Sequence, residues 1–113
     1  MNALRNKVQL IGNIGQDPEV KTFDDGKKVV KLRLATDEKY KNSSGELITE
    51  STWHNLVAWG KTADIIEKHI SKGKEVVVEG KIVNRNYTDK NGEKRYITEI
   101  LVSEVMMLGS KKV

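Results

Sequence analysis

Alternation of apolar and polar residues in short runs is the feature that most restricts the fold of this chain. In the run 29–37, Val30, Leu32 and Leu34 alternate with Lys31 and Arg33. Successive side chains of a β-strand point to opposite faces, so this pattern predicts a strand with one buried face. The same period predicts strands over 6–15, 29–37, 52–59, 75–87 and 96–108.

One stretch has helical spacing instead. Apolar residues recur at three- and four-residue intervals within 61–73, which predicts the only helix of the chain. Thr62 is the expected N-cap, Asp64 lies in the expected first turn, and Gly73 follows the last turn.

The order of these elements is three strands, one helix and a two-stranded hairpin. Asp25–Gly26 and Asn91–Gly92 predict hairpin turns, whereas 38–51 has no apolar period and is expected to be a long polar connection. This order matches an all-β, five-stranded Greek-key barrel of the OB type, with one short helix between strands three and four and a long hairpin joining strands four and five. A small β-sandwich would also produce five alternating segments, but a single helix at that place favours the barrel.

Alternation also separates a core face from an outer face in the predicted barrel. The apolar positions expected to fill the core are Val8, Leu10, Val30, Leu32, Leu34, Leu56, Val76, Val78 and Ile82. In 52–59, parity assigns Leu56 and Ala58 to this core and places Trp53 and Trp59 on the opposite face. Both tryptophans of the chain therefore lie outside the expected core, where a second layer, a partner subunit or a ligand would have to cover them.

Aromatic and basic residues occur together in several places. Four aromatics, Tyr40, Trp53, Trp59 and Tyr87, lie near Lys39, Lys41, Lys61 and Arg85, whereas Phe23 and Tyr96 have no comparable setting. Aromatic rings stack on unpaired bases while cations contact phosphates, so this combination predicts binding of single-stranded nucleic acid. The formal net charge of +4 is only mildly basic and adds little to this prediction. A structural barrel whose tryptophan face contacts another protein is the alternative.

The rest of the sequence offers little for other function classes. The chain has no cysteine, and its two histidines, His54 and His69, are not spaced with carboxylates as metal ligands would be. We find no nucleophile–base pair and no phosphate-binding glycine motif, so we expect no enzyme activity, no metal and no cofactor. No apolar run approaches the ~20 residues of a membrane span, and MNALRNKVQL lacks the apolar segment of a signal peptide. A cytoplasmic location without membrane contact is the default expectation.

Segments along most of the chain together resemble the bacterial single-stranded DNA-binding protein (SSB) family. They are NKVQLIGNIGQDPEV, LATDEKYKN, TWHNLVAWGKTADI, and KGKEVVVEGKI with NRNYTDKNGEKRY, and the similarity runs from Asn6 to Leu108. The resemblance implies an OB-fold that assembles as a homotetramer and binds single-stranded DNA without sequence preference. It also implies a role in DNA replication, repair and recombination, in the cytoplasm and in association with the nucleoid.

The resemblance assigns roles to individual residues. The base-stacking positions of the family fall on Tyr40, Trp53, Trp59 and Tyr87. The phosphate-contacting cations that it implies are Lys7, Arg33, Lys61, Lys72, Arg85 and Arg95. His54 matches a histidine at the subunit interface. Asn55 and Asn86 occupy places where a cation is common, so fewer phosphate contacts are expected.

The C-terminus differs from the usual family pattern. Family members usually continue into a glycine-rich linker and an acidic tip that recruits repair and replication proteins, but no acidic residue follows Glu104 here. Either the sequence is part of a longer chain, or this is a short member without recruitment. We expect residues 1–108 to form an OB-fold domain that binds single-stranded DNA and residues 109–113 to form a C-terminal stub. Other OB-fold binders, such as a primosomal restart protein or an RNA-binding barrel, share the fold and stay open as alternatives.

Overall fold

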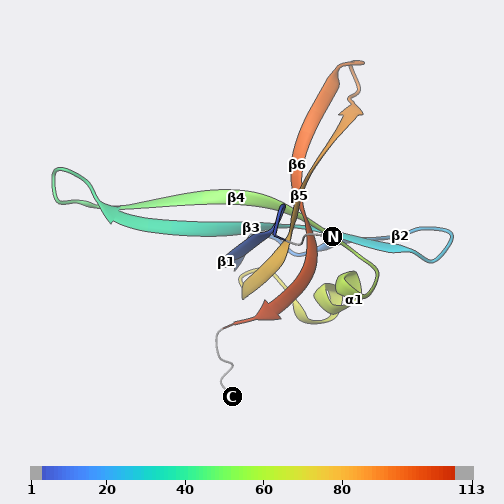
Figure 1. Cartoon of the computed structure of the whole chain (residues 1–113), viewed down its shortest axis with the longest axis horizontal. Helices are drawn as coiled ribbons and strands as arrows, with labels where there is room; N and C mark the ends of the chain where they lie inside the picture. Colours follow the sequence, from blue (N-terminus) through green and yellow to red (C-terminus); the bar gives the residue numbers. More distant parts are fainter. Residues whose placement is uncertain (1–3, 109–113) are drawn as a thin grey trace.

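The alternating runs of the sequence form strands in the computed structural model, which describes residues 4–108 (Figure 1). The elements in chain order are β1 (Val8–Ile14), β2 (Glu19–Thr22), β3 (Lys28–Lys41), β4 (Leu47–Trp59), α1 (Gly60–His69), β5 (Glu75–Thr88) and β6 (Lys94–Met107). The expected C-terminal stub, 109–113, lies outside the described residues. Within 4–108, no helix is both long enough and apolar enough to cross a membrane.

The strands close into a barrel in which β1 and β2 act as one strand, interrupted at 15–18. β1 runs antiparallel to β5, and β2 runs antiparallel to β3. Two bridges between β1 and β3, at Asn13–Ala35 and Ile14–Leu34, close the sheet, and β4 lies parallel to β6. The resulting order, β1-β5-β6-β4-β3-β2, is that of a five-stranded Greek-key barrel with its helix after the third barrel strand. The predicted OB-type barrel is therefore confirmed.

Hairpins project from this barrel as three arms, formed by β2–β3, β3–β4 and β5–β6 (Figure 1). The prediction that 38–51 is a polar connection is wrong, because β3 continues to Lys41 and β4 already begins at Leu47. The two strands pair without a break to the Lys41–Leu47 bridge, and Gly45, with a φ of 83°, closes the turn between them. This ribbon extends beyond the barrel and has no core to cover, so its residues show no apolar period although its backbone is fully paired.

The core consists of the inward faces of the strands and one side of α1. Of the predicted core positions, Val30, Leu32, Leu34, Leu56, Val76 and Val78 are buried, and Val8 and Leu10 are partly buried against them. Ile82 is 45% exposed, so its assignment to the core is wrong. β1 accompanies β5 only as far as Gly80, and Ile82 therefore has the inward parity but no barrel wall beneath it. The buried hydrophobic residues that alternation did not identify are Ile14, Val29, Val57, Ala63, Ile66, Ile70, Ile100 and Val102.

The helix covers the barrel with Ala63 and Ile66 but begins earlier than expected. It starts at Gly60, directly after β4. The N-cap is Trp59, whose backbone is in the extended conformation and whose side chain provides no capping hydrogen bond. The expectation that Thr62 caps the helix is wrong, since the Thr62 hydroxyl donates to the Ser103 carbonyl oxygen at 3.5 Å. Because the helix begins at Gly60, Asp64 lies beyond its first turn, and because it ends at His69, residues 70–73 lie outside it. A φ of 62° at Gly60 allows the abrupt change from strand to helix.

Candidate nucleic-acid interface

Strand register places both tryptophans on one outer face of the barrel. In the β3–β4 pairing, Trp59 lies opposite Val29 and Trp53 lies opposite Ala35, with Asn55 and Val57 between them on β4. Side chains of directly paired residues point to the same side of a sheet, so this face continues across β3. It also continues onto β6, because Val57 lies beside Leu101.

A groove of about 670 Å³ runs along this face between the β2–β3 hairpin and the β5–β6 arm. Its lining residues are Glu19, Val20, Lys21, Phe23, Val29, Lys31, Val57, Trp59, Val83, Arg85, Glu99 and Leu101. Val57, with 6% of its surface exposed, forms part of an apolar floor, which shows that the outer face is not solvent-exposed throughout. Trp59 is 46% exposed and also lines two adjoining hollows. The groove thus combines an apolar floor, exposed aromatic surface and cations at its edges.

Trp53 is 49% exposed and is held in place from the side of the barrel. A Cβ atom added to Gly15 would lie 2.1 Å from the Cζ3 atom of Trp53, so the indole rests directly on the Gly15 backbone. The Arg33 guanidinium carbon lies 4.8 Å from the ring centroid, within the range of a cation–π contact. Gly15 and Arg33 therefore fix the orientation of this ring while half of its surface stays accessible.

The two predicted stacking tyrosines lie on the arms, away from the barrel. Tyr40 is 45% exposed and pairs with Ile48, which puts it on the opposite face of the β3–β4 ribbon from Trp53 in register. Its hydroxyl donates to a Glu50 carboxylate oxygen at 3.3 Å. Tyr87 is 47% exposed and lies across from Arg95 on the β5–β6 arm. The structure thus distributes the four rings over the barrel and two arms and does not gather them in one pocket.

Three of the six predicted phosphate-contacting cations form ion pairs within the protein. Lys7 contacts Glu79 at 2.7 Å, which raises the lysine pKa above its ordinary value through a hydrogen bond and charge attraction. Arg85 donates two hydrogen bonds of 3.0 Å from Nε and a terminal nitrogen to the Glu99 carboxylate. Only 5% of the Glu99 surface is exposed, and the hydrogen bond to Glu99 is the main cause of a raised pKa at Arg85.

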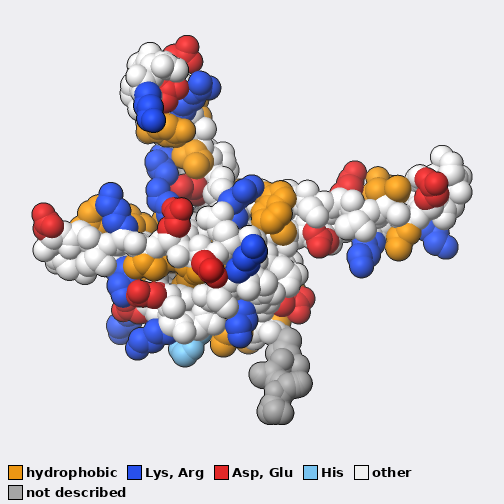
Figure 2. All heavy atoms as spheres, turned by 180° about the vertical axis from the view of Figure 1, so that it is seen from behind, with side chains coloured by type: hydrophobic (Ala, Val, Ile, Leu, Met, Phe, Trp, Pro, Cys, Tyr) orange, Lys and Arg blue, Asp and Glu red, His pale blue; other side chains and the backbone are white. Residues whose placement is uncertain are grey.

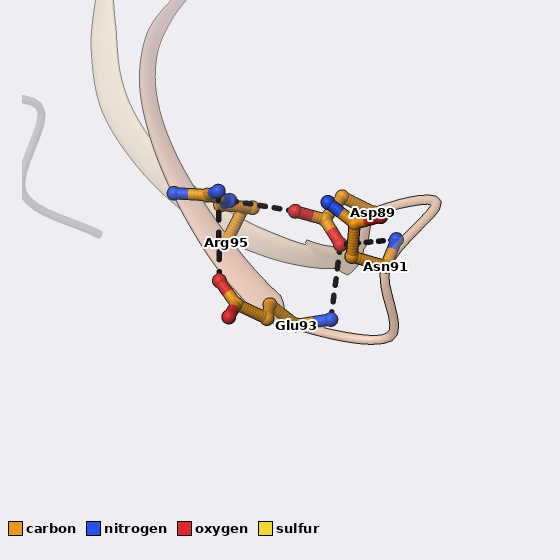
Figure 3. A network of polar contacts seen from close by, with 4 residues as sticks. All are labelled: Asp89, Asn91, Glu93 and Arg95. Atoms are coloured by element: carbon orange, nitrogen blue, oxygen red, sulfur yellow. Dashed lines mark hydrogen bonds and ion pairs between the residues drawn. The ribbon is translucent and has the colours of Figure 1, made fainter.

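Arg95, the third of them, belongs to a polar network at the end of the β5–β6 arm (Figure 3). Its Nε atom donates to Asp89 at 2.8 Å, and the other Asp89 oxygen accepts the backbone N–H groups of Asn91 and Glu93, each at 2.9 Å. The hydrogen bond from Arg95, followed by those from the backbone, lowers the pKa of Asp89. This network holds the turn between β5 and β6, close to Tyr87.

The remaining predicted cations have different surroundings. Arg33 lies against the Trp53 ring, as described above. Lys61, at the start of α1, and Lys72, after its end, are exposed and form no ion pair with residues in the range 4–108. In Figure 2, basic and hydrophobic side chains lie next to each other along all three arms, interspersed with acidic ones.

The sequence model of the single-strand binding protein family matches residues 5–108. The chain belongs to this family. Two curated relatives are the single-stranded DNA-binding protein 1 of Chlorobaculum tepidum, 47% identical over 94% of this chain, and the single-stranded DNA-binding protein of Bacteroides thetaiotaomicron, 50% identical over 94%. The aligned region spans 66% and 67% of those two proteins, so the chain corresponds to about two thirds of their length.

A solved structure has the same fold as this chain. It is described as a Plasmodium falciparum SSB complex with ssDNA, and it superposes with a TM-score of 0.83 at 33% sequence identity. The match covers 96% of this chain and the whole of that chain. Together with the family match, it agrees with the resemblance that the sequence motifs indicated.

His54, which the SSB resemblance places at a subunit interface, lies on the face opposite the tryptophans. It pairs with Leu34 on β3, is half-buried, and its Nε2 atom lies 3.1 Å from the Thr36 hydroxyl. No cluster of histidine and acidic residues among 4–108 has the arrangement of a metal site. The contacts of His54 within one chain are those of a packed side chain.

Several residues of the groove are not among those that the sequence pattern predicted. Phe23, which was given no binding role, stacks on Trp59 with ring centroids 5.9 Å apart and an angle of 16° between the planes. Lys21 and Lys31 also line the groove, and Glu99 is buried in it. The Asp25–Gly26 turn signal could have identified Phe23, because the hairpin that it predicts folds 19–22 back along β3 and towards the end of β4.

Proposed function

We propose that the protein binds single-stranded DNA without sequence preference and protects it during replication, repair and recombination. The observation that carries this proposal is the pair of half-exposed indoles, Trp53 and Trp59, on a grooved face lined with cations. The relatives named single-stranded DNA-binding protein and the SSB structure containing ssDNA support the same ligand. The proposed role is that of a non-catalytic binding protein of the cytoplasm, in contact with the nucleoid.

Base stacking supplies the part of binding that does not depend on sequence. Every base has an aromatic face, and in proteins of this class, this family included, stacking contributes about 1–3 kcal/mol per base. Trp53 and Trp59 would hold bases on the barrel, while Tyr40 and Tyr87 would hold bases on the arms. The strand would therefore run from one arm across the barrel to another, and on the β3–β4 ribbon it would pass to the face opposite Trp53 to reach Tyr40.

Phosphate contacts supply the part of binding that depends on salt. We assign the strongest phosphate contacts to Lys61 and Lys72, because their ammonium groups are exposed and unpaired within 4–108. Lys7, Arg85 and Arg95 would contribute less, since a phosphate must compete with Glu79, Glu99 or Asp89 for each of them. Arg33 would contact a phosphate from its place beside Trp53.

We further propose that residues 1–108 act as one domain and that four copies assemble. A row of apolar side chains crosses the outer face of the sheet, where Ile11 pairs with Val77 and Val77 with Met106. Ile11 and Met106 are exposed, so another subunit could cover this row. Several copies would raise the affinity for a long strand, because contacts after the first become intramolecular. His54 would contact a neighbouring subunit.

Titration with oligo(dT) tests this proposal directly. Stacking on Trp53 and Trp59 is expected to quench tryptophan fluorescence, and the affinity is expected to fall as salt rises, with a slope of roughly −0.7 per phosphate neutralised. Parallel titrations with RNA and duplex DNA should give weaker binding, which separates this function from an RNA-binding barrel. Unchanged fluorescence with oligo(dT) at low salt would favour a protein-contacting role for the tryptophan face. Sedimentation analysis would show whether the assembly is a tetramer.

A further inference from the structure

The Phe23–Trp59 stack is exposed at the edge of the groove. The ring centroids lie 5.9 Å apart with an angle of 16° between the planes, which is an offset-stacked arrangement. Phe23 is 38% exposed and Trp59 is 46% exposed, so neither ring is part of the core. The pair extends the aromatic surface from the end of β4 onto the β2–β3 hairpin.

The backbone of Phe23 is fixed by a closed turn. Its N–H group donates to the Lys27 carbonyl oxygen at 2.7 Å, and its own carbonyl accepts the Gly26 N–H group at 2.9 Å. The Lys27 N–H group also donates to an Asp25 carboxylate oxygen at 3.0 Å. Gly26 has a φ of 89°, which the turn requires. The turn fixes the backbone and the stack on Trp59 positions the ring before any ligand binds, so little ordering opposes binding at this position.

A cation covers the Phe23 ring. The Lys21 ammonium nitrogen lies 5.1 Å from the ring centroid, and Lys21 forms no ion pair with a carboxylate among the described residues. Lys31 lines the same groove. By contrast, Lys28 is held by Asp64 at 2.8 Å and by Glu67 at 2.5 Å. Lys21 is therefore the cation beside this ring that can move onto an incoming phosphate.

We infer that Phe23 is a fifth base-stacking residue and that Phe23, Trp59 and Lys21 form one nucleotide subsite. A base cannot enter between the two rings as they stand, because a ring between two others needs a spacing of about 7 Å, twice a carbon–carbon contact. The base instead packs on the exposed surface of Phe23 and displaces the Lys21 ammonium group. That ammonium group then contacts the phosphate of the same nucleotide. This subsite rests on the proposed binding of single-stranded DNA.

Binding of oligo(dT) by Phe23 and Lys21 variants of the full chain tests the subsite. Phe23→Ala is expected to lower the affinity for oligo(dT) about five- to tenfold. Phe23→Tyr is expected to keep the wild-type affinity, because tyrosine keeps a stacking face. Lys21→Ala is expected to make the salt slope less steep by about 0.7. Ile65→Ala is a matched control, since Ile65 is an exposed apolar residue on the helix.

A second measurement separates direct stacking from mere support of the Trp59 ring. Photocrosslinking of the wild-type protein to oligonucleotides containing 5-iodouridine, followed by mass spectrometry, is expected to give adducts at Phe23. The subsite would be overturned if the wild-type protein binds oligo(dT) and Phe23→Ala binds it with equal affinity, or if no adduct forms at Phe23. Either result would leave the proposed function intact. Absence of binding by the wild-type protein would instead refute the proposed function.

Discussion

Substitution of Gly15 by alanine should weaken DNA binding by displacing an aromatic ring that is itself unchanged. The new Cβ atom would lie 2.1 Å from Trp53 Cζ3 and 2.7 Å from Cη2. A normal carbon contact is about 3.5 Å, so the indole must move by about 1.4 Å. Half of the ring is exposed, and it can therefore swing towards solvent without disturbing the core.

We expect Gly15→Ala to lose about 1 kcal/mol of binding free energy, roughly fivefold in affinity, as part of the ~1–3 kcal/mol that one stacked base contributes. Stability should change little, because Gly15 does not need a left-handed conformation and its N–H group still donates to the Arg33 carbonyl oxygen at 2.9 Å. Alanine at a compatible position also restricts the unfolded chain, which stabilises by about 0.4–1 kcal/mol.

Anisotropy of a dye-labelled oligo(dT) measures this effect in a double-mutant cycle with Trp53→Ala. If Gly15 acts through the indole, Gly15→Ala has no further effect on affinity once Trp53 is alanine. An equal loss in both backgrounds would refute the reasoning, and so would unchanged affinity of the single variant. Thermal unfolding of each variant shows whether the fold is retained.

Other predictions concern the charged residues of the groove and arms. Arg85→Met leaves the buried Glu99 carboxylate without its partner and should destabilise the protein by about 1–3 kcal/mol in urea unfolding. The double variant Arg85→Met/Glu99→Gln should recover part of this loss, and equal stability of the single and double variants would contradict the role of the pair. Lys61→Ala should make the salt slope of DNA binding less steep by about 0.7, while Arg95→Ala should change it less because Asp89 already neutralises that arginine. Asp89 has a pKa below its ordinary value of 3.8 in the folded protein. The Asp89 carboxylate therefore contributes fully to the order of the arm at pH values above the pKa that it has in the unfolded chain. This contribution is lost below about pH 4, as the pH falls through the lower pKa of Asp89 in the folded protein. NMR of the 88–94 turn between pH 6 and pH 2 should show this loss in the wild type and not in Asp89→Asn.

The barrel could be predicted from the sequence because its inward residues alternate over one buried face. Val30, Leu32 and Leu34 illustrate this, since all three lie on one side of β3 and all three are buried. The arms could not be predicted in this way. Of residues 36–41 and 47–52, all but the half-buried Thr36 and Ile48 are exposed, and only backbone pairing, which leaves no mark on composition, makes them strands. Ile82 shows the reverse error, because alternation gives parity but does not say where the barrel wall ends.

The candidate site followed from sequence only in part. Parity was enough to find the exposed face of Trp53 and Trp59. The contact of Phe23 with Trp59 depends on how the β2–β3 hairpin folds over the end of β4, which is a tertiary relationship. The pairing of Arg85 with Glu99 was also missed, although their separation of fourteen residues fits a cross-strand neighbour in the β5–β6 hairpin.

The β3–β4 arm has a consequence for how this protein responds to its ligand. Beyond the Ala35–Trp53 bridge, the ribbon consists of two strands with no third strand beside them. Such ribbons are only marginally stable in water. Amide hydrogens near the Lys41–Leu47 bridge should therefore exchange with solvent much faster than those of the barrel. A strand of DNA that covers the ribbon would slow this exchange. The entropy lost on ordering the arm then makes the net free energy of binding less favourable, and the amides whose deuterium uptake slows would show where the DNA lies along the arm.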